Sequence, residues 1–220
     1  MEIDDRDDYN SFYLDEDKPI TNKTFKKLKN YNKIIFCDEF NQPVINIPSS
    51  IKYISFGKYF NQPVDNLPTN LKSLTFGFDF DQPVDNLPSQ LETLVLAQSF
   101  NQPVEKLPSE LKKLVFGSKF NQPINNLPLG LQKLTFSYNS QFNQSINNLP
   151  SGLQSLIFGN CSAFNQQVNN LPSRLQSISF GKNFNQSMDN LPSGLQTLII
   201  SKNYDKPLNN IPTLLNITRV

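Results

Sequence analysis

The sequence contains no histidine and no tryptophan among its 220 residues, and it has only two cysteines. Without histidine, triads with an imidazole base and histidine-ligated metal sites are excluded. Two cysteines cannot supply the four ligands of a structural zinc site within one molecule. The eight glycines stand singly, so no glycine-rich loop is present that could hold a phosphate group. We therefore expect no catalysis, no cofactor and no metal.

Long hydrophobic runs are absent as well. No stretch of 18 apolar residues occurs, and the N-terminus lacks the basic and then apolar order of a signal peptide. Cys37 and Cys161 lie six repeat units apart, about 29 Å at about 4.8 Å per unit, which is too far for a disulfide. Two of the five glycosylation sequons, Asn143 and Asn185, occupy a repeat position needed inside a turn. These features predict a soluble, cytoplasmic protein with reduced thiols and no membrane partner.

Charge is unevenly distributed along the chain. Residues 1–17 hold eight of the 19 acidic residues and one of the 20 basic residues, so the remainder has a net charge of +8. We interpret residues 1–19 as an acidic, disordered leader. An alternative is that this leader folds back onto basic residues of the body.

In place of a catalytic motif, the sequence has a repeat. The nonapeptide FNQPVDNLP at residues 60–68 returns almost unchanged every 20 residues, which is typical of a stack of similar coils. Its units begin at residues 40, 60, 80, 100, 120, 142, 164, 184 and, in weaker form, 204. The sequence therefore predicts a repeat solenoid over residues 40–220.

Each unit contains one segment with the period of a half-buried strand. Leu74 and Phe76 would face inward while Ser73 and Thr75 face outward. Strands separated by one full coil must be parallel. The recurring prolines, such as Pro63 and Pro68, prevent a helix between them, so the return path should consist of turns and extended segments.

Phenylalanine is concentrated at two positions of the unit, and stacking would align these as two internal columns. The first column begins the motif, and the second ends the strand. The first comprises Phe40, Phe60, Phe80, Phe100, Phe120, Phe142, Phe164 and Phe184, and the second comprises Phe36, Phe56, Phe76, Phe116, Phe136, Phe158 and Phe180.

Two polar positions recur with equal regularity. One is the Asn or Asp that follows each motif phenylalanine, and the other is the Asn that precedes Leu-Pro or Ile-Pro. We expect both to satisfy backbone groups of the tight return path, with a ligand-binding ladder as the alternative. The first set runs from Asn41 to Asp205, and the second comprises Asn46, Asn66, Asn86, Asn126, Asn148, Asn170, Asn190 and Asn210.

The two ends of the repeat array differ from its middle. Residues 20–39 are predicted to form a degenerate capping repeat, with one short helix that Thr21 or Thr24 caps and that presents Phe25 and Leu28 to the first coil. In the last unit Thr218 stands where an apolar residue is expected, which indicates either a frayed strand edge, our preferred interpretation, or a docking surface.

Two neighbouring units are two residues longer than the others, at residues 137–141 and 159–163. Both bulges should emerge on one edge of the solenoid. They are either a binding edge or tolerated surface loops.

The strand letters LxxLxF and the return path ending in Leu-Pro resemble the leucine-rich repeat, and the whole unit resembles more specifically the FNIP repeat of amoebae and of the giant viruses that infect them. This resemblance covers residues 40–212 and extends loosely to 20–39. It implies a mainly β, right-handed, leucine-rich-repeat-like solenoid with one short parallel strand per 20-residue coil and few or no helices in the return path. Several FNIP proteins carry an F-box before the repeats, but about 30 residues precede the repeats here, too few for such a domain.

The strand residues that point away from the core form the surface with which solenoids usually bind proteins. We predict that the chain is a monomeric scaffold and that its partner is an unidentified protein. Basic and aromatic residues on or beside this surface should bind that partner, with Phe78 as the anchor. A nucleic acid or another polyanion bound by the lysine-rich N-terminal half is a disfavoured alternative, and a spacer without ligand is another. The candidate binding residues are Lys52, Tyr53, Lys72, Phe78, Lys112, Lys113, Lys133 and Tyr138.

Overall fold

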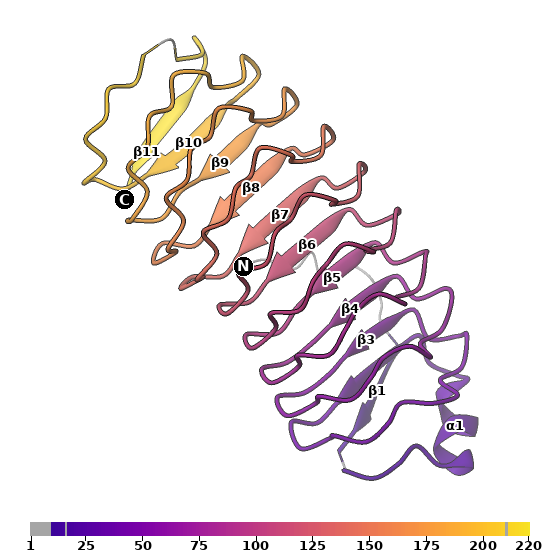
Figure 1. Cartoon of the computed structure of the whole chain (residues 1–220). Coiled ribbons are helices and arrows are strands. Elements are labelled where there is room, and N and C mark those ends of the chain that lie inside the picture. Colours follow the sequence, from indigo (N-terminus) through magenta and orange to yellow (C-terminus); the bar gives the residue numbers. More distant parts are fainter. Residues whose placement is uncertain (1–9, 16, 210) are drawn as a thin grey trace.

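The computed structural model describes residues 10–15, 17–209 and 211–220, without the side chains of residues 22, 23 and 25. One short strand per coil contributes to a single parallel sheet of 11 strands, in which spatial order equals sequence order (Figure 1). The strands are β1 (Ser11–Leu14), β2 (Lys33–Phe36), β3 (Tyr53–Ser55), β4 (Ser73–Thr75), β5 (Thr93–Val95), β6 (Lys113–Phe116), β7 (Lys133–Phe136), β8 (Ser155–Phe158), β9 (Ser177–Ser179), β10 (Thr197–Ile200) and β11 (Asn216–Arg219). The described residues include one helix, α1 (Asn22–Leu28). The predicted mainly β solenoid is confirmed.

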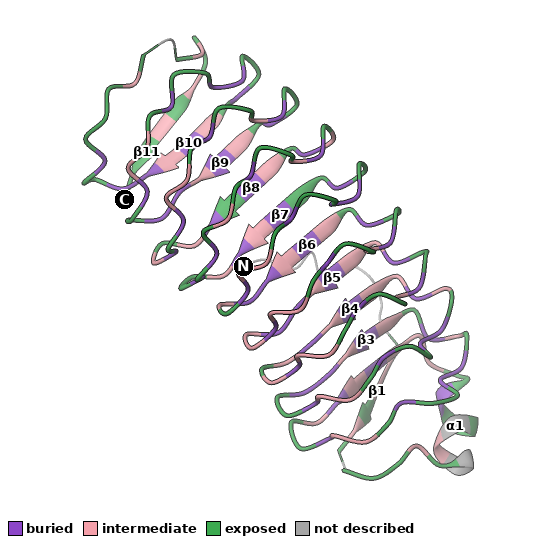
Figure 2. Ribbon diagram, viewed as in Figure 1, coloured by how far each residue is buried: buried purple, intermediate pink, exposed green. Residues whose placement is uncertain are grey.

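The strands pair in the register that the repeat predicts. Ile54 is opposite Leu74, and Leu114 is opposite Leu134. Each of these inward side chains is almost fully buried, whereas the residues on either side of it are half-buried or, at Lys133, exposed (Figure 2). A shift of one residue would turn every inward side chain to the solvent, so the hydrophobic pattern fixes this register.

The two predicted phenylalanine columns are present inside the coils. In the first, successive rings stack with centroids 6.1 Å apart between Phe40 and Phe60 and 6.2 Å apart between Phe80 and Phe100. Their planes are within 11° and 2° of parallel in these two pairs. Within one coil, the rings of Phe76 and Phe80 stack at 3.6 Å and join the two columns. The core is therefore a continuous aromatic stack along the solenoid.

The spacing of these columns shows that the stack is curved. Because equivalent atoms in successive coils are related by the repeat, the 6.1 Å between rings of the first column measures the local spacing of the coils. The second column is more closely spaced, from 4.8 Å between Phe36 and Phe56 to 5.8 Å between Phe158 and Phe180. Paired strands lie about 4.8 Å apart. Coils that are closer at the sheet than at the opposite side place the sheet on the inner side of an arc.

The helix at the N-terminal end is capped as expected. Thr21 is the N-cap, and its Oγ1 accepts a hydrogen bond from the Thr24 amide at 3.3 Å. Leu28 is 1% exposed and packs into the core. The expected contribution of the Phe25 side chain lies outside the described residues.

The structure differs from the sequence prediction in the acidic leader, because residues 11–14 form β1 and pair with β2. Phe12 is opposite Ile34, and its ring packs edge-on against Tyr31 at 5.2 Å. Acidic residues on both sides of this short apolar stretch dominate the composition and obscure the strand. Residues 1–9, for which disorder was also expected, lie outside the described residues.

The last coil differs from the frayed strand edge that the sequence predicted. β11 pairs with β10 over four residues, with Ile217 opposite Leu198, so this coil is 19 residues long. Ile217 takes the inward position that a 20-residue period assigns to Thr218, and it packs against the core. Arg219 Nη1 donates a hydrogen bond to the Tyr204 carbonyl at 3.0 Å. The predicted fraying of this strand is therefore wrong.

Candidate interaction surface

The outward residues of β2–β10 form two columns on the inner side of the arc, which we call the strand face. The parallel register places equivalent residues of successive coils side by side. Most of these side chains are half-buried by their neighbours, and none is needed to fill the core. The first column is Lys33, Tyr53, Ser73, Thr93, Lys113, Lys133, Ser155, Ser177 and Thr197, and the second is Ile35, Ser55, Thr75, Val95, Val115, Thr135, Ile157, Ser179 and Ile199.

Three of the predicted binding lysines lie immediately before the strands, in a column that also contains an acid. Glu92 stands between two of them and forms ion pairs with Lys72 at 2.9 Å and with Lys112 at 2.8 Å. The hydrogen bond from Lys112, followed by that from Lys72, lowers the pKa of Glu92 below its usual value. Lys52 begins this column and is exposed. The sequence analysis did not assign a role to Glu92, although its place in the repeat aligns it with the lysines.

Lys113 and Lys133 lie on the strand face itself. They are register partners on β6 and β7, so two like charges stand side by side on adjacent strands. Tyr53 lies in the same column on β3. Thus six of the eight predicted binding residues share one surface.

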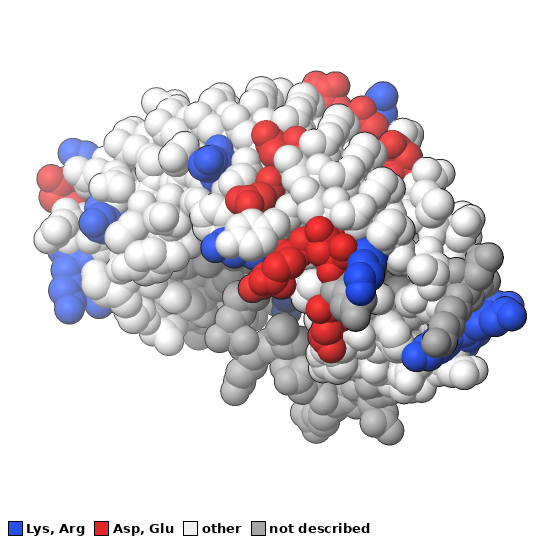
Figure 3. Space-filling view, turned by 90° about the horizontal axis from the view of Figure 1, so that it is seen from below, with Lys and Arg blue, Asp and Glu red and all other residues white. Residues whose placement is uncertain are grey.

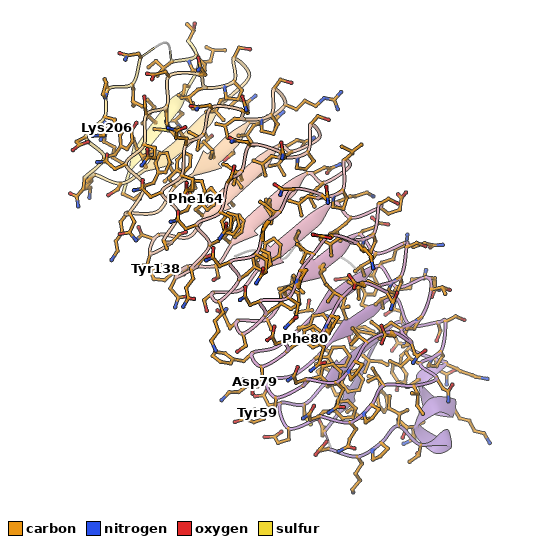
Figure 4. The ribbon with its side chains drawn as sticks, in the orientation of Figure 1. Tyr59, Asp79, Phe80, Tyr138, Phe164 and Lys206 are labelled. Atoms are coloured by element: carbon orange, nitrogen blue, oxygen red, sulfur yellow. The ribbon has the colours of Figure 1, made fainter. Side chains whose placement is uncertain are left out.

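The other two predicted residues lie elsewhere. Phe78 and Tyr138 occupy the turn that follows the strand, at the opposite margin of the sheet and three coils apart. Their side chains are 48% and 63% exposed. Tyr59, which the sequence analysis missed, lies in the equivalent turn of the preceding coil, where Lys58 aligns with Phe78. It is 45% exposed, with Lys58 Nζ 4.8 Å from its ring centroid. Figure 4 shows Tyr59, Asp79 and Tyr138 along this same margin.

The C-terminal half of the surface is neutral. A column of exposed glutamines, Gln132, Gln154, Gln176 and Gln196, replaces the lysines before the strands. Two adjoining shallow hollows of about 500 and 480 Å³ lie along this column, and both are lined by Gln154, Ser173 and Arg174. The surface therefore changes from charged to amide-rich along the arc.

The first Asx column is structural, as predicted. Asn41 Oδ1 accepts a hydrogen bond from the Asn61 amide at 2.9 Å, and the bond recurs from coil to coil. The acceptors that carry this ladder are Asn41, Asn61, Asp81, Asn101, Asn121, Asn143, Asn165 and Asn185. Because backbone amides engage these oxygens, they are not presented as a ligand site. The sequon residues Asn143 and Asn185 belong to the ladder.

Asp17 provides the first acceptor of this ladder. Its Oδ1 accepts hydrogen bonds from the Asn41 amide and from Gln42 Nε2, both at 3.0 Å. These are the bonds that Asn41 accepts from the next coil. The bond from the Asn41 amide is the larger cause of the lowered pKa of Asp17. In the irregular first coil, between β1 and β2, Asp17 thus provides the acceptor that an Asn or Asp provides in the later coils.

The second Asn column corrects our expectation. Its members from Asn46 to Asn190 are exposed, and Asn210 lies outside the described residues. Asn86 Nδ2 donates to the side chain of Asp65 at 3.0 Å, not to a backbone group. Asn46 has a φ of 58°, a left-handed conformation that asparagine tolerates. Among the described residues Asn46 is the only non-glycine residue with a positive φ, so this conformation explains asparagine at Asn46 and not in the rest of the column.

The two inserted segments stack on each other on one margin, as expected. The amides of Cys161 and Ala163 donate to the carbonyls of Tyr138 and Ser140, both at 2.8 Å. A hydrogen bond with Cys161 is the main cause of the raised pKa of Tyr138. Ser140 is buried, and its Oγ accepts a hydrogen bond from the Phe142 amide at 3.1 Å, which satisfies the chain where it re-enters the core.

The charged groups do not assemble into a metal site in the described part of the chain, where no group of three or more His, Cys, Asp or Glu is suitably placed. The neighbouring carboxylates Asp65 and Asp85 interact with Asn86 and, at 3.8 Å, with Lys106. Both cysteines are free thiols and are half-buried. Among the same described residues, no helix has the length and hydrophobicity required to traverse a membrane.

The fold and its surface define a leucine-rich-repeat-like solenoid, a repeat scaffold. The FNIP Repeat pattern matches residues 40–79, 60–99, 100–139, 120–161 and 164–203. The chain belongs to the FNIP repeat family, as its sequence indicated.

A solved structure with a closely similar fold is the crystal structure of CroV588, a giant-virus protein described as a novel circular LRR protein. It is similar to this chain with a TM-score of 0.82 and 36% sequence identity over 94% of this chain. The chain spans about a third of that protein, since the match covers 33% of its length. No curated protein matches the sequence.

Proposed function

We propose that this chain is a non-enzymatic scaffold that binds another protein through the strand face, in the cytoplasm. The observation that carries the proposal is the continuous in-register sheet on the inner side of the arc. It presents two columns of side chains that the core does not require, and a curved array of this kind is how solenoids enclose a partner.

The distribution of charge favours a protein over a nucleic acid. Glu92 already pairs with Lys72 and Lys112, which removes part of the basic potential of the N-terminal half. In the view from below, acidic and basic side chains are interspersed among broad uncharged areas (Figure 3). Nucleic-acid binding normally relies on an extended basic patch.

A binding experiment tests the assignment of the face. The variant K72Q/F78S/K113Q changes two lysines and one exposed aromatic on and beside the strand face. The matched control I45S/K106Q/K206Q changes two lysines and one exposed apolar residue of the return path. Both proteins are immobilised and exposed to extract of the cells that make the protein, and bound proteins are quantified by mass spectrometry.

We expect the strand-face variant to capture at least tenfold less of the specifically bound partner, and the control to capture as much as the wild type. Because K72Q removes one ion pair of Glu92, the variant should lose no more than about 1 kcal/mol of stability and should still unfold in one cooperative transition. Equal capture by the strand-face variant and the wild type would refute the assignment. A partner signal that is replaced by nucleic acid, with retention that falls steeply from 50 to 200 mM salt, would favour the polyanion alternative.

A further inference from the structure

We propose that the lysines on and beside the strand face form a site for an extended acidic peptide, and that residues 1–9 of the same chain occupy it. We call this site the lysine lane; it comprises Lys52, Lys72, Lys112, Lys113 and Lys133. The inference goes beyond the proposed scaffold function, because it names the chemistry of the ligand and a segment that covers the site in cis.

The lysine lane contains two adjacent positive charges that a bound anion would stabilise. Lys113 and Lys133 are register partners, and like charges directly opposite each other on adjacent strands are destabilising. The two outward columns of the strand face contain no acidic residue. Glu92 in the adjacent column is already shared by two lysines. Within the described residues the pair thus has no acidic counterpart, and an acidic ligand would relieve the repulsion.

The chain enters the sheet beside this lane. The Asn10 carbonyl accepts hydrogen bonds from the amides of Asn32 and Lys33, just as the Asn32 carbonyl accepts them from Lys52 and Tyr53. Asn10 therefore occupies the same position of its coil as Lys52 occupies two coils further on. Residues 1–9 are joined to the sheet at the end of the column that contains Lys52, Lys72 and Lys112.

The length and charge of residues 1–9 match the lane. Nine extended residues span at most about 30 Å. Lys113 on β6 lies five strands from β1, about 24 Å at about 4.8 Å per strand. Five acids and one arginine give the segment a net charge of −4, opposite in sign to the lane. These acids are Glu2, Asp4, Asp5, Asp7 and Asp8.

A tethered segment has a strong advantage over a free ligand. Short flexible linkage gives an effective concentration on the order of millimolar, so a weak electrostatic interaction is sufficient to cover the lane. A protein partner that uses the N-terminal half of the strand face must displace residues 1–9. The segment therefore selects partners that carry their own acidic stretch.

The test uses full-length chains and a fluorescein-labelled synthetic peptide of residues 1–9, with binding followed by fluorescence anisotropy at 50 mM salt. In the neutralised variant E2Q/D4N/D5N/D7N/D8N the cis segment loses its charge while the lane is intact. We expect this variant to bind the peptide at least tenfold more tightly than the wild type. Adding K113Q/K133Q should reduce that affinity at least tenfold, whereas adding K106Q/K206Q should leave it within twofold.

Equal affinity of the wild type and the neutralised variant would overturn the proposal, as would an unchanged affinity after K113Q/K133Q. Carbodiimide coupling of carboxylates to lysines in an equal mixture of ¹⁴N- and ¹⁵N-labelled wild type identifies the occupant. Cross-links from Glu2 or Asp4 to the lane within one isotope support binding in cis, and mixed-isotope cross-links would show instead that a second copy provides the segment. Both experiments omit any external partner, so their failure leaves the capture experiment for the scaffold function intact.

Discussion

The asparagine that follows each motif phenylalanine substitutes for a backbone acceptor. Its side-chain oxygen binds the amide of the equivalent residue in the next coil at 2.8–2.9 Å through most of the stack. Where the structure describes the return path, it contains no regular strand that could pair these amides. A partly buried N–H must find an acceptor, and a side chain supplies it.

This role predicts a specific loss of stability for Asn101→Ala. The change removes the acceptor of the Asn121 amide, and leaving a buried donor unpaired costs about 1–3 kcal/mol of the free energy of unfolding. The control Asn126→Ala removes an exposed asparagine of the second column and should cost less than about 0.5 kcal/mol. Urea denaturation measures both values. If the two variants were equally stable, the ladder would have no energetic role.

Some of the strands could be predicted from the sequence, and others could not. The strands of the regular coils follow directly from the alternation at residues such as Leu74 and Phe76, because one face of the sheet must be buried. β1 was not predicted, since four residues flanked by acids carry too little pattern. The shortened last coil was also missed, because a one-residue deletion moves Ile217 inward and only pairing with β10 reveals it.

Glu92 connects the starts of three neighbouring strands, β4, β5 and β6, through its ion pairs with Lys72 and Lys112. Its pKa is lowered in the folded state. A depressed carboxyl pKa stabilises the fold above the unfolded-state value, near 4.5, and this contribution is lost as the pH falls through the folded pKa. Since about a third of the Glu92 side chain is exposed, solvent screening keeps the effect small.

We therefore expect Glu92→Gln to lower the free energy of unfolding at pH 7 by up to about 1 kcal/mol. The difference from the wild type should shrink as the pH falls below about 4.5 and be lost once the pH is below the lowered pKa of the folded state. The exposed Glu105→Gln serves as the control and should show little difference at any pH. Denaturant unfolding from neutral to acidic pH provides the measurement. A difference that does not shrink with falling pH would mean that the ion pairs are not its cause.

The whole molecule behaves as a stack in which each coil is supported by its neighbours. The ring of Phe120 contacts those of Phe100, Phe142 and Phe116. Phe40 begins the column, and its stacking partners are Phe60 along the column and Phe36 beside it. Stability in such an array depends on nearest-neighbour interfaces.

Phe120→Ala should consequently cost about 3–5 kcal/mol of the free energy of unfolding, because it opens a cavity between two stacked rings. Phe40→Ala should lower the free energy of unfolding by less than Phe120→Ala does, because the first column continues on only one side of Phe40. Thermal and urea unfolding of both variants, with the wild type as reference, test this order. Equal losses would argue against a one-dimensional stack.

The sequence by itself determined the period, the parallel strands, the two aromatic columns and the identity of the repeat. This was possible because the 20-residue period repeats the same pattern of apolar, aromatic and turn residues in every coil. Only the tertiary structure decided which side chains meet across coils, such as Glu92 with Lys72 and Lys112, and Asp17 with Asn41. It also separated Phe78 and Tyr138 from the strand-face residues, and it placed that face inside the arc. These features depend on three-dimensional neighbours and on small differences in coil spacing, which no single repeat unit encodes.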